Sequence, residues 1–311
     1  RMADAAVAPA RTEAPAAPPQ WRDVHVTAQD GLRLYLREYG KRTSPHLPVV
    51  CLPGLTRNAR DFHDLAVFLS THKHRPRRVL ALDFRGRGGS AYDRTWKNYN
   101  PLTEMSDVVD VLTARGIEEA AFVGTSRGGL VTMLLSGARP TALKAVVLND
   151  IGPAVDGRGL LRIKNVLSRS SIPASWEDAA DTLQRAYEAH FPAIDREGWM
   201  DYARRTYADA DGKPQRDYDP KLLKTLNNID FNQPLPTLWP QFDGLAHAPV
   251  MVLRGENSDI LSPETLEAMQ ERRPDLDVLT VPGAGHAPFL TEMPVMTRIS
   301  GFITTAEDKR G

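Results

Sequence analysis

One serine in this sequence stands in a setting that favours nucleophilic chemistry. Residues 124–128 read GTSRG and match the pattern G-x-S-x-G. The segment follows an apolar run that ends at Val123 and opens a stretch with helical spacing, so the serine would stand at a tight strand-to-helix turn. Small neighbours let the backbone approach closely, and a helix N-terminus favours a developing negative charge. We therefore predict that Ser126 is a nucleophile.

A serine nucleophile needs a base, and His286 is the preferred candidate. It lies in the segment GAGHAP at 283–288, directly after the last expected strand, where small residues suit a loop that presents an imidazole. His247 precedes a strand and would lie at the opposite edge of the sheet. The other histidines either precede the nucleophile or lie in exposed or inserted segments, and they are His25, His46, His63, His72, His74 and His190.

The imidazole needs a carboxylate to orient it, and three candidates follow expected strands. We prefer Asp259, which comes after the strand that ends near Arg254, because open α/β sheets place their sites at the carboxyl ends of strands. Asp150 is the main alternative, since it follows the strand that ends at Leu148. Glu256 is a weaker alternative in the same loop as Asp259.

Acyl transfer also needs hydrogen-bond donors for the oxyanion. We expect one donor to be the backbone N–H of Arg127, the residue after the nucleophile. The other is expected from Leu55, in the loop that follows the apolar run 48–52. For the Arg127 side chain, a structural salt bridge is the more ordinary role, and contact with an acidic substrate group is the alternative. This chemistry requires no metal and no organic cofactor.

The elements that must position these residues alternate along the chain. An alternating pattern on both sides of Asp30-Gly31 predicts a hairpin. Short, continuous apolar runs separated by helical spacing then predict buried strands. These runs lie at 48–52, 79–82, 120–123, 143–148, 249–253 and 277–281. The order predicts an α/β fold with one mostly parallel twisted sheet flanked by helices.

Between residues 152 and 240 this rhythm stops. Helical patterns rich in large aromatic residues occur there and no β-like run is evident, so we predict a helical cap inserted into a core of 21–151 and 241–311. Residues 1–20 are rich in Ala and Pro and are expected to form a disordered arm. Four aromatic residues are candidates for the substrate pocket, namely Trp176, Phe191 and Trp199 in the cap and Phe289 after the histidine.

Composition limits the partners of the chain. Basic and acidic residues both number 39, so no net charge attracts nucleic acid or an anionic membrane. The single cysteine, Cys51, excludes an internal disulfide, and no apolar run approaches the ~18 residues needed to span a bilayer. We expect a cytoplasmic monomer or small homo-oligomer. The basic run HKHRPRR at 72–78 is expected to be a solvated loop.

Together these motifs resemble the α/β-hydrolase superfamily, in its capped serine esterase and carbon–carbon-hydrolase branch. The segment DFRGRGGS at 83–90 is similar to that family's D-x-R-G-x-G-x-S loop. The segments around Asp259 and His286 are similar to its acid and histidine loops. The likeness covers roughly residues 22–150 and 240–305, whereas the cap matches in position and helical character alone.

The resemblance implies hydrolysis of a carboxylic ester through an acyl-enzyme, on a small or oligomeric substrate, with aliphatic polyesters among the candidates. Lactone hydrolysis, carbon–carbon bond hydrolysis and perhydrolysis use the same triad, and some ligand-binding receptors share the scaffold. The sequence departs from relatives with an aspartate nucleophile. It also has Pro53 where the oxyanion loop often has histidine, and Ala287 where carbon–carbon hydrolases usually have tryptophan.

Overall fold

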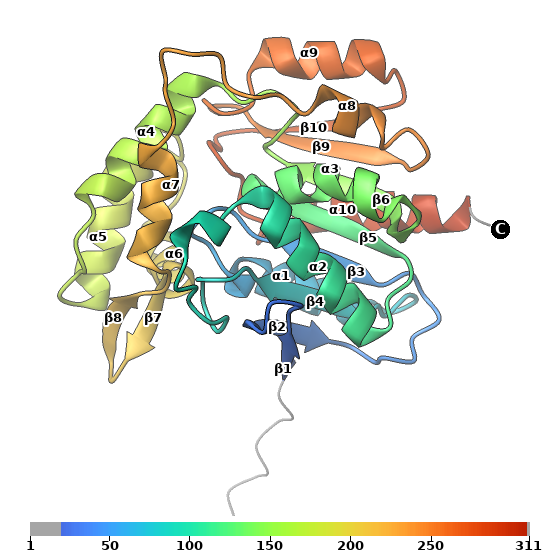
Figure 1. The fold of residues 1–311 in the computed structure, drawn as a ribbon, viewed down its shortest axis with the longest axis horizontal. Coiled ribbons are helices and arrows are strands. Elements are labelled where there is room, and N and C mark those ends of the chain that lie inside the picture. The colour runs from blue at the N-terminus through green and yellow to red at the C-terminus, as the bar shows by residue number, and fades with distance from the viewer. Residues whose placement is uncertain (1–19, 310–311) are drawn as a thin grey trace, which may run out of the picture.

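The computed structural model describes residues 20–309 and is built around an eight-stranded sheet (Figure 1). Its strands are β1 (Arg22–Thr27), β2 (Arg33–Tyr39), β3 (Val49–Leu52), β4 (Val79–Asp83), β5 (Ala120–Thr125), β6 (Leu143–Asn149), β9 (Val250–Gly255) and β10 (Asp277–Val281). They lie in the order β1-β2-β4-β3-β5-β6-β9-β10. The hairpin β1–β2 pairs antiparallel with β4, and the strands from β4 to β10 are parallel to one another. The predicted fold class is confirmed.

Helices cover both faces of the sheet, because its central strands are apolar on both sides. One layer contains α1 (His63–Ser70) and α10 (Met293–Asp308). The other contains α2 (Pro101–Arg115), α3 (Arg127–Ala138), α8 (Trp239–Asp243) and α9 (Pro263–Arg272). In β5, Phe122 enters the second layer while Ala121 and Val123 enter the first. Short 3₁₀ turns occur at η1 (Ala59–Phe62), η2 (Trp96–Asn98), η3 (Pro140–Ala142) and η4 (Pro220–Leu222).

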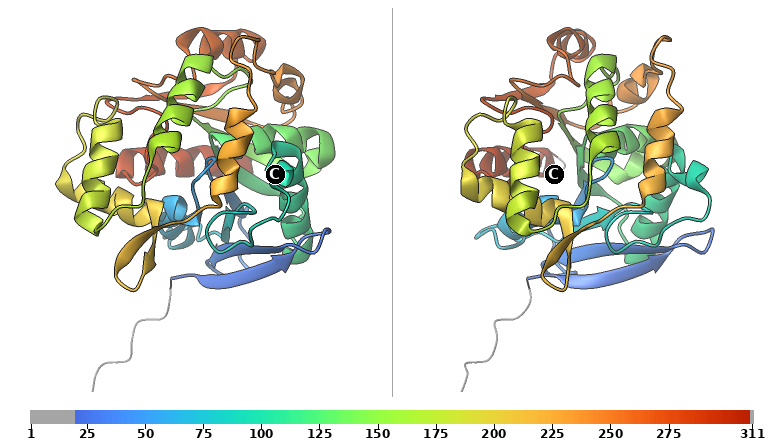
Figure 2. Two further views of the ribbon diagram at one scale, coloured as in Figure 1. Left: turned by 60° about the vertical axis from the view of Figure 1, so that its left-hand side comes forward. Right: turned by 90° about the vertical axis from the view of Figure 1, so that its left-hand side faces the viewer.

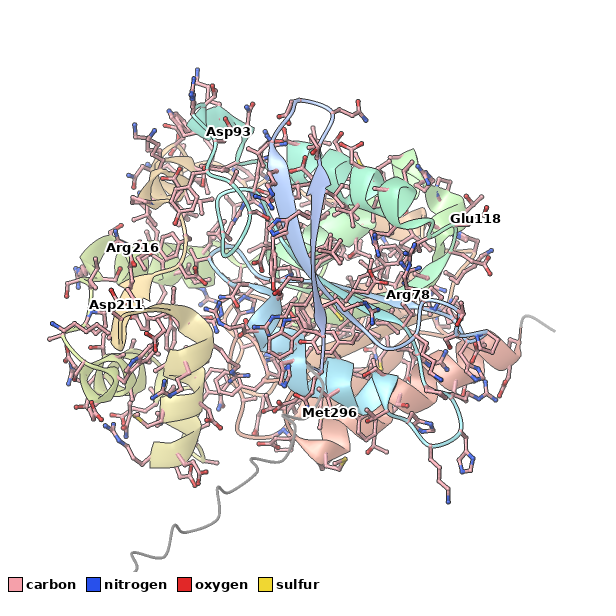
Figure 3. The ribbon with its side chains drawn as sticks, turned by 90° about the horizontal axis from the view of Figure 1, so that it is seen from below. Arg78, Asp93, Glu118, Asp211, Arg216 and Met296 are labelled. Carbon is pink, nitrogen blue, oxygen red and sulfur yellow. The ribbon has the colours of Figure 1, made fainter. Side chains whose placement is uncertain are left out.

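The stretch predicted to be a cap follows β6, lies to the left of the core in Figure 1, and faces the viewer in the right-hand view of Figure 2. Its helices are α4 (Gly157–Arg169), α5 (Trp176–Tyr187), α6 (Arg196–Thr206) and α7 (Leu223–Asn227). It also contains a hairpin that we did not predict, formed by β7 (Tyr207–Ala210) and β8 (Lys213–Arg216). Asp211 and Gly212 both adopt positive φ, as a two-residue type I′ turn requires. In Figure 3 the labelled Asp211 and Arg216 lie on the cap side, far from Arg78 of the core. The arm predicted at 1–20 lies almost wholly outside the described residues.

The last part of this stretch is tied to the core through backbone hydrogen bonds. The N–H of Gly88 donates to the carbonyl of Asp217 at 2.9 Å, and the N–H of Asp219 donates to the carbonyl of Gly86 at 2.7 Å. Gly86 has a φ of 76°, and a Cβ at that position would lie 2.5 Å from Tyr99. The loop at 83–90 therefore holds residues 217–219, which connect β8 to α7, against the core.

The basic run at 72–78 forms a loop, and residues 72–76 are exposed or half-buried as predicted, but its last two arginines are buried. Arg77 is buried, and both Arg77 and Arg75 pair with Glu307 of α10, at 2.9 and 2.8 Å. Arg78 pairs with the buried carboxylate of Glu38 at 2.8 Å. Arg75 and Arg77 thus join this loop to α10, and Arg78 joins it to β2. The two buried guanidinium groups, those of Arg77 and Arg78, each have a carboxylate partner out of water.

Glu307 should contribute stability that depends on pH. Burial alone would raise its pKa, but the bonds from Arg77, the Leu47 N–H and Arg75 lower the pKa to about 2. A folded-state pKa below the ordinary value of 4.5 gives stability that is present above that value and is lost as the pH falls toward 2.

We expect Glu307→Gln to lower the free energy of unfolding by about 1–3 kcal/mol at neutral pH, measured by urea denaturation. The difference from the wild type should shrink as the pH is lowered from 4.5. Glu271→Gln is the control, since Glu271 is exposed on α9. A difference that stays constant with pH would show that ionisation of Glu307 is not the source of the effect.

Candidate active site

Ser126 stands at the turn between β5 and α3, with φ 50° and ψ −114°. Its neighbours must be small for this turn to form. A Cβ at Gly124 would lie 2.6 Å from the carbonyl of Gly128, and a Cβ at Gly128 would lie 2.0 Å from the carbonyl oxygen of Leu52. The strained backbone thus presents the serine hydroxyl at the carboxyl end of the central strand. There it lies at the N-terminus of α3, whose dipole favours the negative charge that develops when the serine attacks.

Three side chains form a continuous line of hydrogen bonds at this edge. His286 Nε2 lies 2.8 Å from Ser126 Oγ, and His286 Nδ1 lies 2.7 Å from Asp150 Oδ2. The three residues follow β5, β10 and β6. Their arrangement is that of a nucleophile, a base and a group that orients the base.

Asp150 is held rigidly beneath the imidazole. The residue is fully buried and has φ 55°. Its Oδ1 accepts a hydrogen bond from the Gly255 N–H at 2.8 Å, and its Oδ2 accepts one from Ser258 Oγ at 2.6 Å in addition to the imidazole bond. A carboxylate with these donors remains satisfied out of water and keeps the imidazole in one orientation.

The preferred acid from the sequence, Asp259, is wrong on this geometry. Its carboxylate pairs with Arg162 of α4, through Nε to Oδ2 and through Nη2 to Oδ1. The physical reason is how far each acid lies from the end of its strand. Asp150 is the first residue after β6, whereas Asp259 lies several residues after β9, in a loop that contacts α4. Glu256 does not reach the imidazole either, and it accepts a hydrogen bond from the Gly283 N–H at 2.8 Å.

The two residues expected to supply the oxyanion donors lie close to Ser126, and their role stays a prediction. Leu55 lines the cavity at Ser126, and Arg127 is the first residue of α3. Within the described residues, neither of these two backbone N–H groups donates a hydrogen bond, so both are available to a ligand. The Arg127 side chain forms a structural salt bridge with the buried Glu104 at 2.6 Å, and Glu104 also pairs with Arg87 at 3.0 Å.

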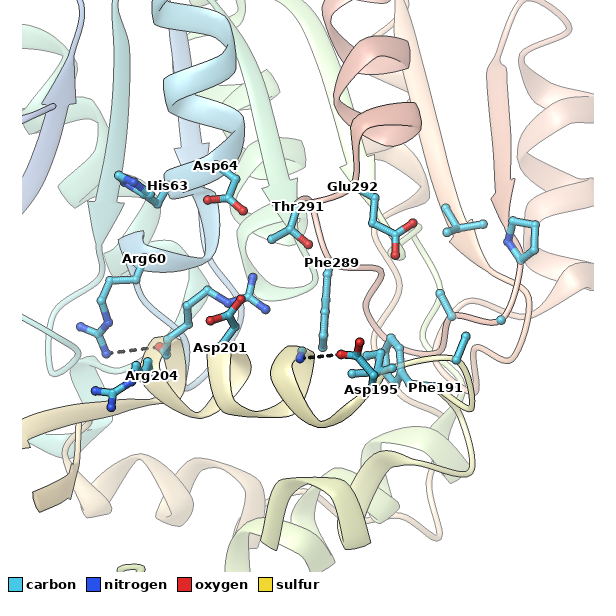
Figure 4. A pocket seen from close by; sticks show the side chains of 18 of the residues that line it. Arg60, His63, Asp64, Phe191, Asp195, Asp201, Arg204, Phe289, Thr291 and Glu292 are labelled. Atoms are coloured by element: carbon cyan, nitrogen blue, oxygen red, sulfur yellow. Dashed lines mark hydrogen bonds between the residues drawn. The ribbon is translucent and has the colours of Figure 1, made fainter. Parts of the chain in front are cut away.

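Two neighbouring cavities surround the site. The catalytic cavity has a volume of about 120 Å³ and is lined by Ser126 and His286. The outer cavity has a volume of about 600 Å³ and lies between α6 and the loop that carries the histidine (Figure 4). Phe289 lines both cavities and stacks between Phe191, at 5.0 Å, and Tyr202, at 4.6 Å. Arg205 also lines both cavities, so Phe289 and Arg205 together form the wall that the two cavities share.

The four candidate pocket residues have different places. Phe289 lines the catalytic cavity, and Phe191 lines the outer one. Trp176 and Trp199 line neither, because both are buried in the apolar cluster between α5 and α6. The sequence could not separate these roles, since a buried aromatic residue and a pocket-lining one have the same composition signal.

Several residues of the catalytic cavity were missed altogether. They are polar and come mostly from the stretch predicted to be a cap: Arg57, Asp61, Arg162, Tyr187, Tyr202 and Arg205. No motif marks them. The only sequence feature that points to them is the number of arginine and tyrosine residues in the amphipathic helices α4 to α6. The same feature is typical of a helix face that contacts solvent.

Within residues 20–309, no group of three or more His, Cys, Asp or Glu side chains is arranged to hold a metal ion. None of the helices in that range combines the length and apolar character needed to cross a membrane.

A family model described as the alpha/beta hydrolase family matches residues 49–296. The chain belongs to this family. A crystal structure of an alpha/beta hydrolase from Novosphingobium aromaticivorans is 39% identical and has a TM-score of 0.82, and the match covers 93% of this chain and 99% of that one. The resemblance that the motifs indicated is confirmed.

Two relatives of this chain are hydrolases by name. The chain is 29% identical to the 3-hydroxybutyrate-oligomer hydrolase of Cupriavidus necator, over 88% of this chain and 94% of that protein. It is 25% identical to the esterase YbfF of Escherichia coli, over 77% of this chain and 85% of that protein. This α/β-hydrolase is accordingly a hydrolase, and the bond that it cleaves has to be argued from the site.

Proposed function

We propose that this α/β-hydrolase cleaves carboxylic esters through a covalent acyl-enzyme. The observation that carries the proposal is the unbroken hydrogen-bonded line from Asp150 through His286 to Ser126. Such a line activates a hydroxyl that would otherwise be a weak nucleophile.

In the proposed reaction Ser126 Oγ attacks the ester carbonyl while His286 Nε2 accepts its proton. The backbone N–H groups of Leu55 and Arg127 hold the oxyanion, and Asp150 holds the imidazole in the tautomer that has a proton on Nδ1. The imidazolium then gives its proton to the leaving alcohol. A water molecule, deprotonated by the same imidazole, releases the acid from Ser126.

The catalytic cavity supports a preference for short acyl groups. Its volume of about 120 Å³ is small beside the ~300–1,000 Å³ of common ligand pockets. We propose that residues 152–240 act as a cap, since Arg162, Tyr187 and Tyr202 from this stretch line the cavity. With a 3-hydroxybutyrate-oligomer hydrolase among its relatives, we propose short hydroxyacid ester units, including oligomers, as substrates.

The test is a panel of p-nitrophenyl esters from acetate to dodecanoate, assayed beside lactones and short hydroxybutyrate oligomers. We expect the highest kcat/KM at acetate to butyrate, and a burst of p-nitrophenol equal to the enzyme concentration where deacylation limits the rate. Turnover of the lactones or of vinylogous carbon–carbon substrates without turnover of any open ester would contradict the proposal.

Removal of the Phe289 ring from the shared wall should relax the chain-length limit. We expect Phe289→Ala to raise the octanoate-to-acetate ratio of kcat/KM by about ten- to two-hundredfold, because a longer chain could then extend from the catalytic cavity into the outer one. Trp176→Phe is the matched control in the cap interior, and it should keep the wild-type ratio. An unchanged ratio in a folded Phe289→Ala protein would show that this ring does not limit chain length.

A further inference from the structure

The wall of the catalytic cavity carries more positive than negative side chains. Three guanidinium groups line it, those of Arg57, Arg162 and Arg205, together with one carboxylate, that of Asp61. Arg57 is neutralised, since its Nη2 and Nε lie 2.7 and 2.8 Å from the two oxygens of Asp61. The other two guanidinium groups differ, since Arg162 is paired with Asp259 and Arg205 has no carboxylate partner among the described residues.

Two nitrogen atoms of the Arg162 guanidinium are held by hydrogen bonds, and the third has no partner within residues 20–309. Asp259 accepts hydrogen bonds from Nε and Nη2. The buried Nη1 has no hydrogen-bond partner among the residues that the structure describes. The helix cannot shift easily against the acid loop, because a Cβ at Gly159 of α4 would lie 2.0 Å from the Asp259 carbonyl oxygen. A buried, unpaired N–H of a charged group is costly unless a ligand supplies its acceptor.

Arg205 of α6 forms no ion pair with any described carboxylate. Its guanidinium lies over the rings of Phe289, at 4.9 Å, and Tyr202, at 5.5 Å, and its buried Nε has no hydrogen-bond partner among the described residues. Although burial alone would raise the pKa of Asp61, Arg57 and, more weakly, Arg205 lower it. Arg205 therefore acts on this cavity as an uncompensated positive charge.

We propose that Arg162 and Arg205 bind a carboxylate of the substrate. The inference rests on the proposed ester hydrolysis and names its substrate class, which is short esters that carry a free carboxylate. Arginine suits this task because its planar fork matches the two oxygens of a carboxylate. Ser126 and both guanidinium groups line one cavity of about 120 Å³, so the carboxylate and the scissile carbonyl belong to the same small unit.

The kinetic test compares monoethyl succinate with its neutral isostere ethyl succinamate. We expect the wild type to prefer the carboxylate ester by about ten- to hundredfold in kcat/KM. Arg162→Met and Arg205→Met should each reduce this ratio, mainly through a higher KM for monoethyl succinate. Arg205→Lys should keep part of the preference that Arg205→Met loses, because lysine retains the positive charge but lacks the planar guanidinium. Arg158→Met, at an exposed site on the same helix as Arg162, is the control and should keep the wild-type ratio.

A second measurement separates this inference from the proposed reaction. The wild type should bind glutarate, observed as a rise in Tm with glutarate concentration, and the Arg162→Met/Arg205→Met double variant should not. If p-nitrophenyl acetate is hydrolysed but the two succinyl esters react equally and glutarate does not bind, the carboxylate site is overturned while ester hydrolysis stands. If glutarate binds through the two arginines but no ester is turned over, the proposed reaction fails and the anion site stands.

Discussion

Ser126→Ala should lose about five to six orders of magnitude in kcat on a short p-nitrophenyl ester, on the scale of serine losses in hydrolases with this kind of triad. The expectation follows from the position of the hydroxyl, 2.8 Å from His286 Nε2 at a backbone turn with positive φ. The remaining rate would come from oxyanion donors and binding alone, because alanine has no atom to carry the acyl group.

Labelling by an alkyl fluorophosphonate gives the matching readout. The reagent should modify the wild type once, at Ser126, and should leave Ser126→Ala unmodified, as judged by mass spectrometry of the intact protein. Ser168→Ala, at an exposed site on α4, is the control and should label as the wild type does. Labelling that persists in Ser126→Ala would remove this serine from the mechanism.

Asp150→Asn should lose on the order of 10⁴ in kcat. An asparagine amide would donate to Nδ1 rather than accept from it, which would leave the imidazole in the wrong tautomer to deprotonate Ser126. Asp259→Asn should cost far less on a neutral ester, since Asp259 contacts Arg162 and not the imidazole. Its effect should instead appear as a higher KM for esters that carry a carboxylate.

The comparison of these two variants needs a check on folding. Asp150 also accepts hydrogen bonds from the Gly255 N–H and Ser258 Oγ, so Asp150→Asn should be compared with the wild type by thermal melts before its kinetics are interpreted. If Asp259→Asn suffered the larger loss in kcat, or Asp150→Asn kept wild-type turnover, the role of the acid would not belong to Asp150.

Asp150 and Asp259 show which part of the site can be predicted from the sequence. Apolar runs predict the strands, and the strands predict that the polar residues at their carboxyl ends share one edge of the sheet. Because β6 and β9 are neighbours, both Asp150 and Asp259 satisfy that rule. What separates them is where a loop sends the side chain after the strand ends, and that direction depends on Arg162, which lies some hundred residues away in the chain.

The β7–β8 hairpin shows a case in which the sequence pattern did not predict the structure. Asp211-Gly212 is a two-residue turn signal, but the residues on either side lack the alternation of apolar side chains that identifies strands. The hairpin forms nevertheless, and an isolated pairing between Arg87 and Tyr218 continues the contact with the core just beyond it. Tertiary context of this kind overrides weak local propensity, and a single sequence does not display it.

The tie between the core loop at 83–90 and residues 217–219, which lie within the stretch 152–240, has a practical meaning for protein engineering. Since Gly88 bonds Asp217 and Gly86 bonds Asp219 through the backbone, a segment transplanted in place of the proposed cap is best joined to the native chain before residue 217. A chimera that exchanges residues 152–216 keeps this junction intact. One that exchanges 152–240 must rebuild the junction, because backbone groups of the new segment would have to take the places of the Asp217 carbonyl and the Asp219 N–H.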